Sequence, residues 1–198
     1  MPLHLSSGGD FTPYVRFMAS TSTWEMNADG ERKSFTFTKA IADLANINEG
    51  WGLMAEGEAP QWQWDSADND WLKKPGEGEW RRGISVMFYA PKMFGDEEPT
   101  REFSTTGTGA CMGIEALYAE YEASVGNNLG KVPVVEFQGA EGVKVGKGRT
   151  AVPKLKIVSW VDRPDAMDGD AEEVAPPPPA APVAPASTAA PGDDSDGF

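Results

Sequence analysis

The 198 residues carry 31 acidic side chains against 17 Lys and Arg, a formal net charge of −14. This length suits one domain with an appendage and not two full domains. His4 and Cys111 are the only histidine and cysteine, which excludes a disulfide framework, a cysteine-based zinc site and a histidine-based catalytic triad in the main body of the chain. We therefore predict that the protein is not an enzyme and uses no cofactor or metal.

Targeting signals are missing from the sequence as well. Residues 1–11 lack a basic segment followed by an apolar run, and no apolar stretch approaches the length of a membrane span. We expect a cytoplasmic protein without membrane contact.

The first half of the chain reads mainly as β-strands. Residues 11–26 alternate with period two, which predicts one long strand with Val15 and Phe17 on one side and Trp24 on the other. Further strands are expected at 34–38, 51–56, 60–64 and 80–90, with a short helix at 39–46 and a polar loop at 65–78.

The second half contains the clearest helix, at 109–125, where apolar residues recur at three- and four-residue steps. A loop at 91–100 and a strand at 101–105 precede the helix, and strands at 131–138 and 152–161 follow it, joined by a glycine-rich hairpin. Three strands, a helix and two strands is the element order of the OB-fold, a small β-barrel that binds oligonucleotides. We predict a mainly β, OB-fold-like closed barrel with one principal helix and loop insertions; other small barrels and α+β folds share this order.

The chain divides at residue 164. Residues 1–164 form the predicted domain, and residues 165–198 form a tail rich in Pro and Ala that contains no Lys or Arg and is expected to be disordered. The eight acids of the tail leave a net charge of −6 on the domain, within which residues 131–164 carry +4. An acidic balance counts against nucleic-acid binding, but this segregation of charge weakens the objection.

Aromatic and cationic side chains share strand faces opposite apolar ones. Single-stranded nucleic acid needs this combination, because aromatic rings stack on bases while cations neutralise phosphates. Core packing of the aromatics and simple solubility of the lysines are the competing interpretation. The candidate nucleic-acid-binding residues are Tyr14, Arg16, Trp24, Trp62, Trp64, Lys73, Lys74, Arg81, Tyr89, Lys144, Lys147, Arg149, Lys154, Lys156 and Trp160.

The last residues of the tail combine acids with one aromatic side chain. Asp193, Asp194, Asp196 and Phe198 are candidates for binding a partner protein, with the ring in an apolar pocket and the carboxylates near Lys or Arg. This pattern resembles the C-terminal tip of single-stranded DNA-binding proteins, the bacteriophage members more than the bacterial ones. Gly197 departs from the bacterial pattern, which usually has Pro there.

The resemblance implies a protein that coats single-stranded DNA during phage replication or recombination, in the cytoplasm of the bacterial host. It also implies that the tip recruits replication and recombination proteins. Charge segregation adds the expectation that the acidic tail competes with DNA for the basic face. A homo-oligomer is left open, and the alternative function is that of a virion, assembly or adaptor protein that binds other proteins and no nucleic acid.

Overall fold

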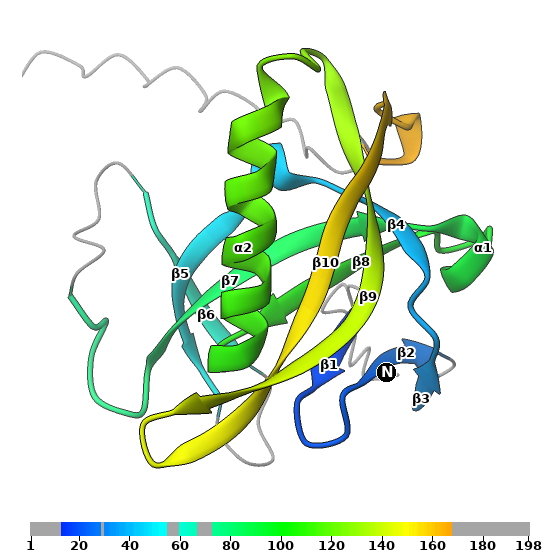
Figure 1. Ribbon diagram of the computed structural model, residues 1–198. Coiled ribbons are helices and arrows are strands. Elements are labelled where there is room, and N and C mark those ends of the chain that lie inside the picture. The colour runs from blue at the N-terminus through cyan, green and yellow to red at the C-terminus, as the bar shows by residue number, and fades with distance from the viewer. Residues whose placement is uncertain (1–12, 29, 55–59, 67–72, 168–198) are drawn as a thin grey trace, which may run out of the picture.

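The computed structural model describes residues 13–28, 30–54, 60–66 and 73–167 (Figure 1). These residues form a mainly β domain with one long helix, as the sequence predicts. The strands are β1 (Tyr14–Met18), β2 (Thr23–Ala28), β3 (Glu31–Phe35), β4 (Lys39–Ala42), β5 (Asn48–Leu53), β6 (Gln61–Trp64), β7 (Arg81–Tyr89), β8 (Thr100–Thr105), β9 (Lys131–Val145) and β10 (Gly148–Asp162). The helical segments are η1 (Leu44–Asn46), α1 (Pro91–Phe94), α2 (Thr108–Val125) and η2 (Asp165–Met167).

All ten strands belong to one curved sheet. The strand order is β10-β9-β4-β7-β8-β1-β2-β3, and β5 pairs with β7 and carries β6 on its other side. Every pairing is antiparallel except the short parallel contact between β1 and β8. No ladder within the described residues joins β3 to β10, the two ends of this order, so the sheet is open and the predicted closed barrel is not confirmed.

Aromatic residues fill the core on the inner face of the sheet. Trp24 is 1% exposed, and its ring centroid lies 4.8 to 5.8 Å from those of four phenylalanines. The four are Phe17, Phe37, Phe103 and Phe137. Because both faces of its indole are covered by these rings, the prediction that Trp24 binds nucleic acid is wrong.

The position of Trp24 follows from a turn that the sequence analysis missed. The predicted strand at 11–26 is a hairpin, β1 and β2, with Ser22 at a positive φ of 57° between them. The hairpin pairs Phe17 with Trp24, so both side chains lie on the same, buried face. The predicted helix at 39–46 is also wrong: β4 and the single turn η1 occupy that segment.

Helix α2 packs along β10, at the inner face of the sheet (Figure 1). Two glycines allow the close approach: a Cβ atom at Gly113 would lie 2.5 Å from the carbonyl oxygen of Pro153, and one at Gly109 would overlap the carbonyl oxygen of Ala151. Ile114 and Leu117 of α2 are buried in the core. Strands β9 and β10 are each 15 residues long, so the predicted glycine-rich hairpin between them is formed by the two strands themselves.

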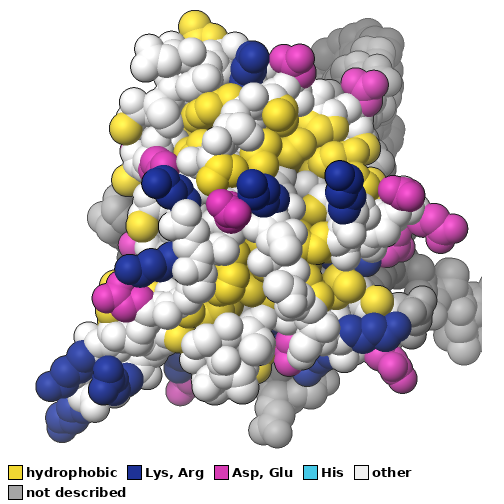
Figure 2. All heavy atoms as spheres, turned by 45° about the vertical axis from the view of Figure 1, so that its right-hand side comes forward, with side chains coloured by type: hydrophobic (Ala, Val, Ile, Leu, Met, Phe, Trp, Pro, Cys, Tyr) yellow, Lys and Arg dark blue, Asp and Glu magenta, His cyan; other side chains and the backbone are white. Residues whose placement is uncertain are grey.

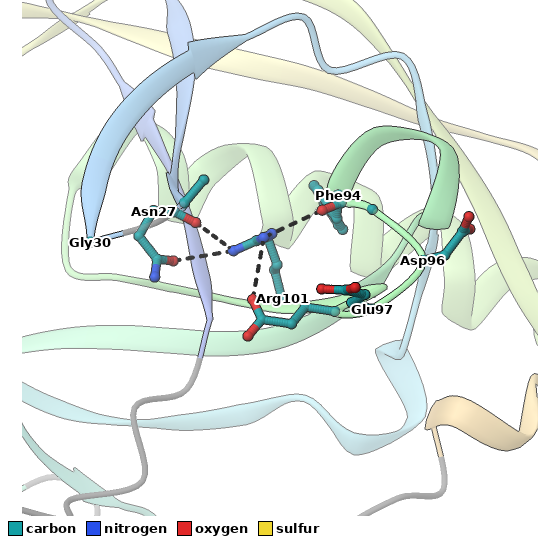
Figure 3. Close-up of a pocket in the computed structure, with 9 residues that line it drawn as sticks. Asn27, Gly30, Phe94, Asp96, Glu97 and Arg101 are labelled. Carbon is teal, nitrogen blue, oxygen red and sulfur yellow. Dashed lines mark hydrogen bonds and ion pairs between the residues drawn. The ribbon is translucent and has the colours of Figure 1, made fainter.

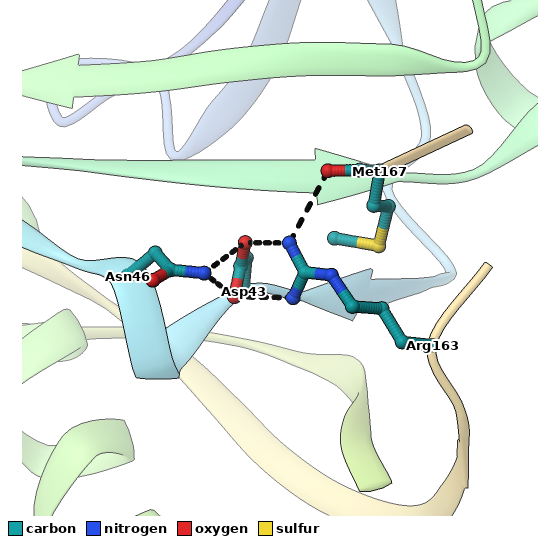
Figure 4. Close-up of polar contacts among 4 residues, drawn as sticks. All are labelled: Asp43, Asn46, Arg163 and Met167. Atoms are coloured by element: carbon teal, nitrogen blue, oxygen red, sulfur yellow. Dashed lines mark hydrogen bonds and ion pairs between the residues drawn. The ribbon is translucent and has the colours of Figure 1, made fainter. Parts of the chain in front are cut away.

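An ion pair holds the end of β10 to η1 (Figure 4). The Arg163 guanidinium donates to both carboxylate oxygens of Asp43, at 2.9 and 2.6 Å, and to the Met167 carbonyl oxygen. Asn46 donates to the same carboxylate. Met167 is buried, so the folded part of the chain extends beyond the predicted boundary at residue 164. The remaining tail lies outside the described residues.

Candidate nucleic-acid interface

Trp62 and Trp64 form a stacked pair on β6. Their ring centroids are 4.6 Å apart and their planes differ by 11°. Both side chains are half-buried, and β6 lies at an edge of the sheet, where β5 is its one partner strand among the described residues. The two candidates predicted on one face of this strand are therefore brought together, with part of their ring surface exposed.

Glycines on the neighbouring strands make room for the two indoles. In the register of β5, Gly52 lies opposite Trp62 and Gly50 opposite Trp64. A Cβ atom at Gly52 would lie 2.7 Å from Trp62 Cζ3, and one at Gly83 on β7 would lie 2.8 Å from the same atom. The rings consequently lie across a surface without side chains, which we call the glycine floor: Gly50, Gly52 and Gly83.

Arg81 extends the same face of the sheet. It lies opposite Gly52 on the side away from Trp62, so the cation and the indole flank one glycine. Its side chain is 68% exposed and its only ion pair in the described residues is to Glu79, at 3.4 Å, which is 87% exposed. Such an exposed ion pair contributes little stability in water, so another anion easily replaces Glu79 as the partner of Arg81.

A second ion pair fixes the far side of this region. Arg82 points to the opposite face from Arg81 and donates to both oxygens of Asp65, at 2.8 and 2.6 Å, while its guanidinium carbon lies 5.6 Å from the centre of the Trp51 ring. These hydrogen bonds raise the pKa of the Arg82 guanidinium. Since Asp65 directly follows Trp64, the ion pair anchors the end of β6 beneath the indoles. Trp51 and Arg82 were not among the predicted site residues.

The β9–β10 hairpin carries the next group of predicted cations. Lys144 and Arg149 lie opposite each other in the ladder, Lys147 occupies the turn, and all three are exposed. No ion pair to any of them exists within the described residues. Figure 2 shows Lys and Arg side chains gathered on a projecting corner of the molecule, and in Figure 1 the hairpin projects beyond α2.

The hairpin and the tryptophan pair meet at the start of α2. Thr106 lies against the glycine floor, where a Cβ at Gly52 would be 2.6 Å from its Cγ2, while a Cβ at Gly109 would be 2.7 Å from Thr150 Oγ1 at the base of the hairpin. Three residues of extended chain span at most about 11 Å. The glycine floor and the base of the hairpin therefore both contact the chain at the start of α2. Lys73 and Lys74, both exposed, lie in the connection from β6 to β7.

The remaining candidates on β10 do not form one site. Trp160 stacks on Tyr121 of α2, with ring centroids 5.8 Å apart. Lys154 is bound to Glu141 at 2.6 Å, and its neighbour Lys156 is exposed. The register shift after Ile157 adds one residue, Val158, to β10 and reverses its alternation, so the prediction that Trp160 shares a face with the two lysines is wrong. The shift after Pro153 adds its extra residue to β9, and Lys154 and Lys156 remain on one face.

The candidates on β1 and β7 are also separated. Arg16 forms a double hydrogen bond with Glu25, at 2.9 and 2.5 Å, which neutralises its charge. Tyr14, its neighbour on β1, is half-buried. Tyr89, at the other end of β7 from Arg81, is half-buried in a shallow hollow. The tip residues Asp193, Asp194, Asp196 and Phe198 lie outside the described residues.

A hollow of about 770 Å³ beside α1 has acidic walls (Figure 3). Asp96, Glu97 and Glu98 line it, and Arg101 is only 3% exposed. The Arg101 guanidinium donates to the Asn27 carbonyl oxygen at 2.6 Å, and burial lowers its pKa, opposed by Glu98. The arginine thus serves to hold β2 and α1 to β8, and the carboxylates make the hollow unsuitable for a polyanion.

In residues 13–28, 30–54, 60–66 and 73–167, no group of three or more His, Cys, Asp or Glu is arranged to hold a metal ion. None of the helices in those ranges has both the length and the apolar character needed to cross a bilayer. No protein-family model, no curated protein and no solved structure matches this chain.

Proposed function

We propose that this protein binds single-stranded DNA without sequence preference and coats it during phage-type replication or recombination. The observation that carries the proposal is the stacked, half-exposed pair Trp62 and Trp64 on the glycine floor, with exposed Arg81 in register beside it. A ring face accepts any unstacked base, and each stack contributes about 1–3 kcal/mol. Duplex DNA hides its base faces, so such a surface selects single strands.

The hairpin supplies the phosphate contacts in this proposal. Lys144 and Arg149 face each other directly across the ladder, and like charges in that position destabilise a hairpin. A bound phosphate removes that repulsion, so the cost in the free protein becomes a gain in binding. Lys147 in the turn and Lys73 and Lys74 before β7 add further cations at the margins of the same surface.

The strand arrangement agrees with an OB-type domain, which we propose as its fold relationship. The β4–β5 segment, β7 and β8 are followed by α2 and then by β9 and β10, with the order β10-β9-β4-β7-β8 in the sheet. OB-folds bind oligonucleotides on the face of their second and third strands and through the loops after the first and fourth. In this chain those loops are the β6 region and the basic hairpin.

We further propose that the tail serves partner proteins and competes with DNA. Asp193, Asp194 and Asp196 would meet basic side chains of a partner, and Phe198 would fill its pocket. Residues 168–198 carry seven acids, and as a tethered segment they would compete with DNA for the basic hairpin at high effective concentration. Removal of residues 168–198 is therefore expected to tighten DNA binding at low salt, and unchanged affinity at fixed salt would contradict the competition.

The direct test is a titration of the protein with oligo-dT, followed by tryptophan fluorescence and by anisotropy of labelled DNA. We expect quenching that weakens steeply with salt, and a Trp62→Ala/Trp64→Ala variant that binds about 10- to 1,000-fold more weakly. Trp160→Ala is the matched control, because that indole is occupied by Tyr121. A folded wild-type protein that leaves oligo-dT free at low salt would overturn the proposal and favour the assembly or adaptor function.

A further inference from the structure

A second surface with the character of a nucleic-acid site lies on the outer face of β10, β9, β4 and β7. One cross-strand row contains Val134, Ile41 and Tyr89, which are direct neighbours in the register. The next row contains Lys156, Glu136 and Lys39. An apolar row that ends in an aromatic ring thus runs beside a row that carries two lysines, and we call the two rows together the outer strip.

Tyr89 lies in the most recessed part of the outer strip. A shallow hollow of about 360 Å³ is lined by its ring, by Ile41 and Val134, and by Lys39 and Lys92 at the margin. Lys39 forms a 3.7 Å pair with Glu136, and both are substantially exposed, so the pair is weak. Lys92 and Lys156 form no ion pair within the described part of the chain. The outer strip, together with Lys92 at its margin, thus carries three lysines against one glutamate and is net positive on a domain that is net acidic.

Figure 2 shows the molecule turned so that the right-hand side of Figure 1, where β4 and α1 lie, comes forward. Hydrophobic side chains gather near the centre of the view, and separate Lys and Arg side chains cross it in a row. Protein–protein interfaces are depleted in lysine, whereas a single strand requires an aromatic surface bordered by cations. The charge therefore favours a polyanion over a second copy of the chain.

Strand β7 connects the outer strip to the tryptophan pair. Arg81 and Tyr89 share one parity at the two ends of this nine-residue strand, so their side chains project from the same face of the sheet. At about 3.3 Å per residue they are about 26 Å apart. That separation corresponds to about eight nucleotides at the 3.4 Å spacing of stacked bases, and to fewer in an extended strand.

We propose that the outer strip is a second subsite for the same DNA strand, with Tyr89 stacking on a base and Lys39, Lys92 and Lys156 contacting phosphates. The proposal rests on the proposed function and adds the path of the DNA to it. The DNA strand runs along β7, from the tryptophan pair toward α1. An oligonucleotide too short to span β7 occupies only the subsite at the tryptophans, and a longer one occupies both. Oligonucleotide length therefore separates the two sites.

The experiment compares oligo-dT of about 4 and about 16 nucleotides, the range of site sizes for one OB domain. We expect Tyr89→Ala to weaken binding of the longer strand about 5- to 150-fold and to leave the shorter one unchanged. We expect Lys39→Ala/Lys92→Ala to reduce the slope of log affinity against log salt by about 1.4 for the longer strand. Arg32→Ala/Lys33→Ala, which removes the same charge from β3 at the other end of the strand order, is the matched control.

The outcomes distinguish the two proposals. If wild-type protein binds neither oligonucleotide, both the proposed function and the proposed role of the outer strip are wrong. Wild-type protein that binds both, with the longer strand unaffected by the Tyr89 and lysine variants, leaves the function intact and overturns the outer strip. Variants that change the sedimentation of the protein but not its DNA affinity would also overturn it, because the face would then be an interface between copies.

Discussion

Replacing Gly52 by Ala tests whether the glycine floor is what seats the tryptophan pair. The added Cβ would lie 2.6 Å from Thr106 Cγ2 and 2.7 Å from Trp62 Cζ3, closer than such atoms approach in proteins. Either the indole or the start of α2 must move. Because the indole is half-exposed and the Thr106 region is held by α2, we expect Trp62 to be displaced from its position over β7.

The expected magnitudes follow from that displacement. Forcing one extra methyl group into a packed contact costs about 1–3 kcal/mol of folding free energy. Loss of one base-stacking surface weakens oligo-dT binding by a similar free energy, about 5- to 150-fold. Denaturant unfolding measures the first effect, and anisotropy with labelled oligo-dT measures the second under conditions where the variant is fully folded. The near-ultraviolet circular dichroism of the indoles reports whether the stacked pair is disturbed.

Gly126→Ala is the matched control for this experiment. Gly126 has a helical backbone, with φ −58° and ψ −26°, and no atom lies within 4 Å of the Cβ that would be added. We expect unchanged DNA binding for this variant. A folded Gly52→Ala protein with wild-type affinity for oligo-dT would refute the reasoning, because the position of Trp62 would then be irrelevant to binding.

Three further predictions concern the rest of the domain. Trp24→Ala should destabilise the protein by about 3–5 kcal/mol in denaturant unfolding, and a loss below about 1 kcal/mol would contradict its place in the core. Burial raises the pKa of Asp43, but hydrogen bonds from Arg163 and Asn46 outweigh it and hold the pKa below its ordinary value of 3.8. The stability that ionised Asp43 gives the folded state is fully present above pH 3.8 and is lost as the pH falls through the lowered pKa. The free energy of unfolding of Asp43→Asn should therefore fall less steeply with decreasing pH than that of the wild type. An unchanged pH dependence below about pH 4 would refute this role of Asp43. Burial, with Glu115 nearby, raises the pKa of the half-buried Cys111 thiol from 9.0 to about 11, so a thiol reagent at neutral pH should react with the folded protein about 100-fold more slowly than with the unfolded protein; equal rates would contradict this.

Local patterns predicted the elements that pack in a regular way. The helix at 109–125 and the strand at 80–90 agree with α2 and β7 within about one residue, because one face of each is apolar and the other is polar. The hairpin of β1 and β2 was missed because its turn, residues 19–22, contains no Gly, Asn or Pro. Ser22 adopts the positive φ that Gly or Asn normally supplies. One missed turn reversed the face assigned to Trp24.

The candidate site was predictable only in part. Two tryptophans separated by one residue on a short strand indicate a shared face, so the sequence predicted that Trp62 and Trp64 lie on one face. The stacking of their rings was seen only in the structure. The glycine floor depends on the register of β5, which joins its glycines to residues 10 to 14 positions away on β6 and about 30 positions away on β7 and leaves no local signal. The failure at Trp160 has a related cause, since the extra residue in β10 after Ile157 has no signature in the alternation of the sequence.

The negative charge of the domain is a weaker objection to DNA binding than its net value implies, because the acids are not equally available. Arg16, Arg82 and Arg163 each hold a carboxylate at 2.6 Å or less, and these pairs are neutral units that position strands. The cations of the hairpin and of the outer strip include five with no ion pair in the described residues. These five are Lys92, Lys144, Lys147, Arg149 and Lys156. A polyanion responds to the electrostatic field at the surface that it contacts and not to the net charge of the whole chain. Salt at about 0.1 M screens that field beyond about 10 Å. Acids paired within the fold therefore cost little at the DNA surface, and the seven acids of residues 168–198 oppose binding only while that segment lies near it.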